Sequence, residues 1–210
     1  MKASRIMLSS AALIALCMPA AFAQTAASTS STAAPQSDKP ATIQQRKENQ
    51  QDRIANGVQS GQLTAGETKN LENKEAGINK EESAMRADDN GHLTAPDRTK
   101  LNQQQNKVSN QIYTDKHNAN TAHYGNNKVG QRRENQQDRI ANGIRSGQLT
   151  PRETANLENK EQGVNKEVAG MRQADGGKLT KGDKAVVNHQ QNKLSKQIYN
   201  KKHNGAKGPR

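Results

Sequence analysis

The chain carries one long segment twice, and this duplication constrains its fold more than any other feature. The decapeptide Glu-Asn-Gln-Gln-Asp-Arg-Ile-Ala-Asn-Gly begins at Glu48 and returns unchanged at Glu134. Residues 46–117 align with residues 132–203 at a constant offset and without a gap. About two thirds of the aligned positions are identical. The sequence therefore predicts two tandem units of the same structure.

Each unit contains two copies of a short motif, Gly-x-Leu-Thr-x-x-acid, that is typical of a helix start. The threonine can cap a helix while the acid three residues later accepts a hydrogen bond from the threonine amide. In one copy a proline follows the threonine, at a helical position where a missing amide hydrogen is tolerated. We expect four capped corners, formed by Gly61, Leu63, Thr64, Glu67, Gly91, Leu93, Thr94, Asp97, Gly147, Leu149, Thr150, Glu153, Gly177, Leu179, Thr180 and Asp183.

Apolar residues between the corners recur at helical spacing. Leu71, Ile78 and Met85 are seven residues apart, which places one narrow apolar stripe on a helix face. The preceding segment, 42–56, is rich in glutamine, so we expect its helix to form only when docked, with turns at Asn56-Gly57 and Ser60-Gly61. The prediction is an all-α protein with about three helices in each unit, in a degenerate EF-hand-like layout.

The N-terminal 23 residues are typical of a secretory signal peptide. Lys2 and Arg5 precede an apolar run, and Ala21-Phe22-Ala23 is a small-x-small cleavage site. The run is too short for a membrane span, so no span is expected after cleavage. The only cysteine, Cys17, lies within the signal. We expect a periplasmic or secreted protein without disulfides.

The remaining segments follow from composition and the repeat. Residues 24–41 are rich in Ala, Ser and Thr and are expected to form a disordered linker. The predicted domains are helical repeat 1 at 42–117, a linker at 118–131, helical repeat 2 at 132–204 and a basic tail at 205–210.

The chain is basic and hydrophilic. Its formal net charge is +12, its aromatic content is 2% and its mean hydropathy is −1.11. This composition leaves little apolar surface for a core and resembles that of hydrophilins. Because charges of both signs alternate, most of them are expected to be solvated helix surface. An anionic envelope polymer is one alternative partner. The mature chain has only a few scattered tyrosines, so no nucleic acid is expected.

Calcium is the strongest cofactor alternative, because an EF-hand also joins two helices through a glycine-containing loop. The donors do not fit well. When Gly91 is placed at the sixth loop position, Arg86 stands where the first carboxylate belongs. Asp88, Asn90 and Asp97 retain the most oxygen donors and are weak metal candidates. The capped-corner interpretation is preferred, and no cofactor is expected.

Neither an activated nucleophile nor a phosphate-binding glycine loop is present in the sequence. Carboxylates are numerous, but they stand among lysines on what we expect to be polar helix faces, where perturbed pKa values are not expected. Tyr113 and His117, four residues apart, are expected to stack on one helix face. The sequence therefore predicts a non-enzymatic protein with no catalytic residues.

Two sequence blocks carry a resemblance. Ile54-x-x-Gly57-x-x-Ser60-Gly61-x-Leu63-Thr64-x-x-Glu67-x-x-x-Leu71-Glu72 and Gln111-Ile112-Tyr113-x-x-Lys116-His117-Asn118 resemble those of uncharacterised small secreted bacterial proteins. The resemblance implies a periplasmic or secreted helical protein and brings no catalytic residues. We expect an interaction or stress-protective role in the cell envelope. The partner, an envelope protein or an anionic polymer, is not identified by the sequence.

Overall fold

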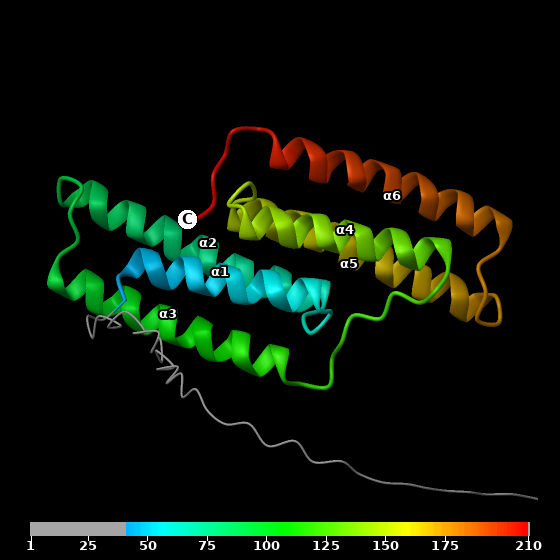
Figure 1. Ribbon diagram of the computed structural model, residues 1–210, viewed down its shortest axis with the longest axis horizontal. Helices are drawn as coiled ribbons and strands as arrows, with labels where there is room; N and C mark the ends of the chain where they lie inside the picture. Colours follow the sequence, from blue (N-terminus) through cyan, green and yellow to red (C-terminus); the bar gives the residue numbers. More distant parts are fainter. Residues whose placement is uncertain (1–40, 210) are drawn as a thin grey trace, which may run out of the picture. The chain divides into compact units, whose positions relative to one another are not determined.

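The computed structural model describes residues 41–209, which form six α-helices and no strand (Figure 1). The predicted all-α class is confirmed. The predicted signal peptide and all but the last residue of the 24–41 linker lie outside the described residues. Within residues 41–209 no helix combines the length and apolarity of a membrane span. The helices are α1 (Ile43–Gln59), α2 (Ala65–Asp88), α3 (Ala95–Lys116), α4 (Lys128–Arg145), α5 (Pro151–Ala174) and α6 (Lys181–Lys202).

A capping box stands at each of the four Gly-x-Leu-Thr-x-x-acid motifs. At the first, the Thr64 amide donates to Glu67 Oε2 at 2.9 Å, and the Glu67 amide donates to Thr64 Oγ1 at 3.3 Å. Thr94, Thr150 and Thr180 cap α3, α5 and α6 in the same way. The glycine that opens each motif has a positive φ, between 62° and 89°. A fifth box, Thr42 with Gln45, starts α1.

Helix α1 continues past the turn that was expected at Asn56-Gly57, so that boundary is wrong. Gly57 is a buried residue inside α1, and the chain turns only at Gly61, whose φ is 72°. A Cβ at Gly57 would lie 2.7 Å from two carbons of Leu63. The glycine is needed for this close approach of Leu63 and not for a left-handed turn.

Helix α4 begins at Lys128, inside the segment expected to be a linker, so the predicted boundary at residue 132 is also wrong. Asn127 caps the helix by accepting a hydrogen bond from the Gly130 amide at 3.1 Å. Val129 is 6% exposed and packs with Val164, Val168 and Val187. This burial stabilises an additional helical turn that the surrounding Asn and Gly residues do not indicate.

The two repeats pack against each other through equivalent helices. Helix α1 contacts α4 and α2 contacts α5, and these are the most extensive helix pairs between the repeats. Helix α3 contacts α1 and α2, whereas α6 contacts α4 and α5, and the two lie on opposite outer sides (Figure 1). Because equivalent helices of the two repeats pair with each other, the described residues 41–209 belong to one unit with approximate two-fold symmetry. The sequence alone left this contact open.

One apolar cluster extends across both repeats and includes Ile54, Leu71, Ile140 and Leu157. The glutamine-rich face of α1 is docked by amide hydrogen bonds. Gln50 Nε2 donates to the Gln105 carbonyl at 2.7 Å, and the equivalent Gln136 donates to the Gln191 carbonyl at 2.9 Å. These bonds explain how so polar a helix can be buried.

Candidate functional site

Two glutamates that the sequence assigned to polar surface are fully buried where α2 meets α5. Glu72 and Glu158 have no exposed surface. Gln51 Nε2 donates to Glu72 Oε2 at 3.1 Å, and Gln137 Nε2 donates to Glu158 Oε2 at 3.0 Å. Burial raises the pKa of both carboxyls well above the usual value, and neighbouring carboxylates raise it further. A protonated carboxyl is therefore favoured at each position.

One turn further along the same helices, Glu75 and Glu161 are also buried, at 0% and 1% exposure. Burial raises the pKa of each to about 7, although the nearby cations Lys47 and Arg133 act in the opposite direction. The expectation of unperturbed carboxylates is thus wrong. The helical period of 3.6 residues shows which positions share one face of a helix. It does not show that the equivalent helix of the other repeat covers that face.

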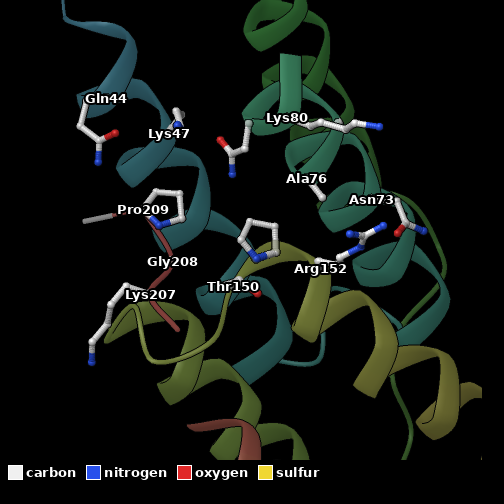
Figure 2. A pocket seen from close by; sticks show the side chains of 13 residues that line it. Gln44, Lys47, Asn73, Ala76, Lys80, Thr150, Arg152, Lys207, Gly208 and Pro209 are labelled. Carbon is white, nitrogen blue, oxygen red and sulfur yellow. The ribbon is translucent and has the colours of Figure 1, made fainter. Parts of the chain in front are cut away.

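A cavity lined by basic residues lies between α1, α2 and the start of α5, and we call it the basic groove. It has a volume of about 670 Å³. The cations Lys47, Lys80, Arg152 and Lys207 line it, and none of the described residues that line it is acidic. Figure 2 shows Lys80 and Lys207 extending away from each other on different sides of the groove. The N-terminal end of α5, at Thr150, adds a partial positive charge. A second basic cavity, of about 950 Å³, lies between α4, α5 and α6 and is lined by Lys128, Arg132, Arg172, Lys178 and Lys184.

The C-terminal tail closes one side of the groove. The Gly208 amide donates to the Gly147 carbonyl at 2.9 Å, which places the tail against the corner before α5 (Figure 2). Asn204 Nδ2 donates to Glu153 Oε1 at 2.5 Å. The tail is therefore attached to the helices as far as it is described, and it is part of the groove wall.

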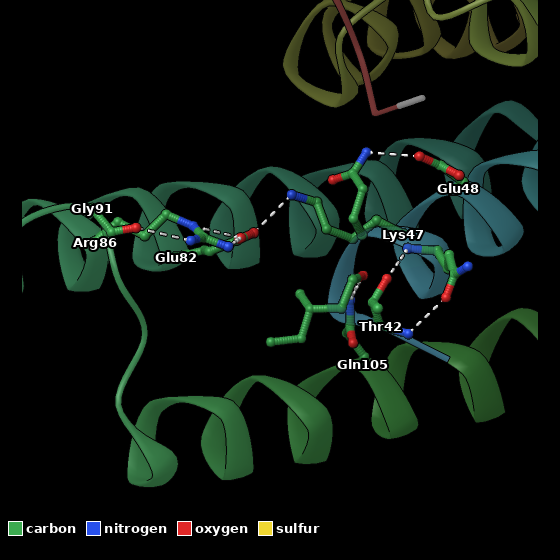
Figure 3. Close-up of polar contacts among 10 residues, drawn as sticks. Thr42, Lys47, Glu48, Glu82, Arg86, Gly91 and Gln105 are labelled. Atoms are coloured by element: carbon green, nitrogen blue, oxygen red, sulfur yellow. Dashed lines mark hydrogen bonds and ion pairs between the residues drawn. The ribbon is translucent and has the colours of Figure 1, made fainter. Parts of the chain in front are cut away.

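Lys47 is held on one side of the groove by a buried ion pair (Figure 3). Its Nζ lies 2.8 Å from Glu82 Oε2, and Arg86 binds the other oxygen of Glu82 at 2.8 Å. Arg86 also donates to the Gly91 carbonyl at 3.1 Å. In the second repeat Val168 replaces Glu82, so among the described residues Arg133, the counterpart of Lys47, forms no such ion pair.

The weak calcium candidates are distributed differently from an EF-hand. A calcium ligand set in this loop would include Asp97. Its Oδ2 already accepts a hydrogen bond from the Thr94 amide at 3.0 Å. Asn90 turns the chain with a φ of 53°. Within residues 41–209 no three His, Cys, Asp or Glu side chains are grouped to hold a metal ion. In the last corner, loss of solvation and the neighbouring Asp183 carboxylate raise the pKa of Asp175.

The acids of the first and third corners have a second role that the motif did not predict. Besides its capping bonds, Glu67 accepts from Asn118 Nδ2 at 2.8 Å. Glu153 accepts from Asn204 in the same way. Each acid therefore fixes the end of the third helix of its repeat to the start of the second. The Tyr113 and His117 rings stack as expected, with centroids 4.2 Å apart.

Comparison of the chain with protein-family models, with curated proteins and with solved structures found no match. The candidate site therefore depends on geometry alone. Sequence reasoning identified the corner residues but missed the basic groove. Lys47, Lys80, Arg152 and Lys207 are far apart in the chain, and only the pairing of the repeats brings them together.

Proposed function

We propose that this chain is a secreted, non-enzymatic helical protein of the bacterial envelope that binds an anionic partner through the basic groove. The observation that carries this proposal is the lining of the groove, which holds four cations and no acid among the described residues. On other parts of the helix surface charges of opposite sign are paired, as in Lys100 with Glu81. A cavity with one sign of charge attracts the opposite charge.

The secretory part of the proposal is supported by the signal-like residues 1–23. The non-enzymatic part is supported by the place of the perturbed carboxyls. Glu72, Glu75, Glu158 and Glu161 are inside the helix pair α2–α5, and none of them lines the groove. Groups that act on a substrate must reach it, and these four are covered by helices.

The test is binding of fluorescent poly-L-glutamate, followed by anisotropy at several salt concentrations. The double variant Lys80→Gln/Arg152→Gln should weaken binding about tenfold, because it removes two charges from one cavity. The matched control, Lys166→Gln/Lys196→Gln, removes the same charge from exposed positions in the second repeat and should change affinity less than about twofold.

Binding should also weaken as salt rises, since the interaction is electrostatic. Equal losses in the two double variants would show that only net charge matters and would contradict the groove. No binding at low salt would contradict the anionic partner altogether.

A further inference from the structure

The second basic cavity combines cations with apolar walls. Val129 is 6% exposed and Leu179 is half-buried, so both apolar side chains are recessed within it. None of the described residues that line the cavity is acidic, and its volume of about 950 Å³ is in the range of small-molecule sites. It shares no lining residue with the basic groove. The two cavities are therefore separate sites.

Shorter apolar side chains widen the second repeat at this place. Three of its valines each replace a residue that is one methylene larger in the first repeat. The pairs are Val129 with Ile43, Val164 with Ile78 and Val187 with Leu101. The larger side chains pack with the main apolar cluster, whereas the valines form a smaller cluster against which Leu179 packs. Because removed methylenes leave space between packed helices, these replacements account for the room beside Val129 and Leu179.

The charge at this place also differs between the repeats. In the first repeat Arg86 binds Glu82 at 2.8 Å and donates to the Gly91 carbonyl at 3.1 Å. Arg172 is the counterpart of Arg86, but Val168 stands in place of Glu82. The Arg172 guanidinium forms no hydrogen bond or ion pair with any described residue. A half-buried cation is thus left unpaired where it lines a cavity.

Four further cations line the cavity with this arginine. The Arg132 guanidinium donates to Asn188 Oδ1 at 3.2 Å, and a neutral amide orients the group without neutralising it. Lys128 and Lys178 stand where the first repeat has a threonine and a histidine, and like Lys184 they are exposed. The second repeat has therefore gained positive charge here while losing an acid, and such a cavity attracts an anion.

We propose that the second basic cavity binds a free single-chain amphiphile with an anionic head, such as a fatty-acid carboxylate. The head is bound by Arg172 and Arg132, because a guanidinium can bind a carboxylate through two parallel hydrogen bonds. The hydrocarbon chain packs against Val129 and Leu179, which removes its methylenes from water. These apolar side chains are recessed, and this favours a single ligand molecule over a membrane surface. The site goes beyond the proposed function and does not depend on it.

The test is isothermal titration calorimetry of the protein with three probes: octanoate, acetate and octyl glucoside. Octanoate should bind at least about fiftyfold more tightly than acetate, because each buried methylene strengthens binding about fourfold. It should bind about tenfold more tightly than octyl glucoside, which has the same chain and an uncharged head. Below its micelle concentration octyl glucoside reports the chain alone.

The variant Arg172→Gln locates the head. It should weaken octanoate binding about tenfold, because it removes the unpaired cation, and should leave octyl glucoside binding within about twofold. Lys166→Gln is the matched control, since it removes the same charge from an exposed position of the same helix. This control should change octanoate affinity less than about twofold.

The variant Val168→Glu restores the acid of the first repeat. The new carboxylate should pair with Arg172 as Glu82 pairs with Arg86, so that octanoate loses its advantage over octyl glucoside. Far-UV circular dichroism shows whether this variant keeps its helices. If it does not fold, Arg172→Gln alone decides the location of the head.

Every other outcome contradicts the proposal. Octanoate binding no tighter than that of octyl glucoside would overturn the anionic head, and binding no tighter than that of acetate would overturn the hydrocarbon chain. Equal losses in Arg172→Gln and Lys166→Gln, or a folded Val168→Glu that keeps the preference, would overturn the location. Co-flotation with phosphatidylglycerol vesicles without octanoate binding would mean a membrane surface and would overturn the free ligand. Poly-L-glutamate binding, measured separately, keeps a failure here distinct from a failure of the basic groove.

Discussion

Glu75 and Glu161 occupy equivalent positions on α2 and α5 and have almost no exposed surface. Both oxygens of Glu75 and one of Glu161 have no hydrogen-bond partner among the described residues. An ionised carboxylate in such a place would lose its hydration without compensation. Burial therefore raises the pKa of each carboxyl from the ordinary 4.5 to about 7.

This shift predicts that the protein is more stable in mild acid than in mild base. The pKa of these two carboxyls is higher in the folded than in the unfolded chain. Their contribution is therefore fully present below pH 4.5 and is lost as the pH rises through about 7. The loss is on the order of 3 kcal/mol per carboxyl. Urea unfolding at pH 5 and pH 8 measures it.

The double variant Glu75→Gln/Glu161→Gln should show a smaller difference between pH 5 and pH 8 than the unmodified protein. Glu134→Gln is the control, because Glu134 is exposed. If the double variant and the control keep the same pH dependence as the unmodified protein, the two buried carboxyls do not titrate in this range.

Glycines inside the helices have two different roles. Gly143, in the last turn of α4, makes room for the Leu149 side chain, because a Cβ there would lie 2.6 Å from Leu149 Cδ1. Leu149 is fully buried. Gly163, in the middle of α5, has nothing within 4 Å of the place where a Cβ would stand. Only the first glycine is required by packing between elements.

We expect opposite effects from the same substitution at these two glycines. Gly143→Ala should lower the free energy of unfolding by about 1–3 kcal/mol, because the buried leucine must move. Gly163→Ala should raise it by about 0.5–1 kcal/mol, because alanine loses less backbone entropy in a helix. Thermal and urea unfolding of the two variants test this. A stabilising Gly143→Ala would show that the corner leucine repacks freely.

The repeats are not independent at the scale of the whole molecule. Each contributes one half of the α1–α4 and α2–α5 pairs, and the main apolar cluster draws on both. A separated repeat would expose Ile54, Leu71 and the buried carboxyl Glu72 at once. That surface is self-complementary, because equivalent helices pair.

A fragment of residues 41–118 should therefore lack stable helical structure when dilute and gain it by pairing with a second copy as its concentration rises. Circular dichroism over a dilution series, with sedimentation equilibrium alongside, measures both properties. The full chain, which carries both halves, is the control and should show no dependence on concentration. A helical fragment that stays monomeric at every concentration would contradict this prediction.

The sequence by itself determined the helical class, the duplication and the helix starts at Thr64, Thr94, Thr150 and Thr180. These features are local, since a capping box is decided by residues three apart and an apolar stripe by residues within one helix. The same local signals placed the end of α1 and the start of α4 wrongly. Gly57 and Val129 take their roles from Leu63 and from the valines of α5 and α6, which are contacts outside the local pattern.

Only the tertiary structure decided which polar residues are buried and where the basic groove lies. Glu72 and Lys47 look like surface residues in the sequence, and their burial depends on equivalent helices of the two repeats pairing. The groove exists because Arg152 and Lys207 of the second repeat meet Lys47 and Lys80 of the first. Such long-range pairing depends on the shape and charge of complete helix faces, which no short sequence window contains.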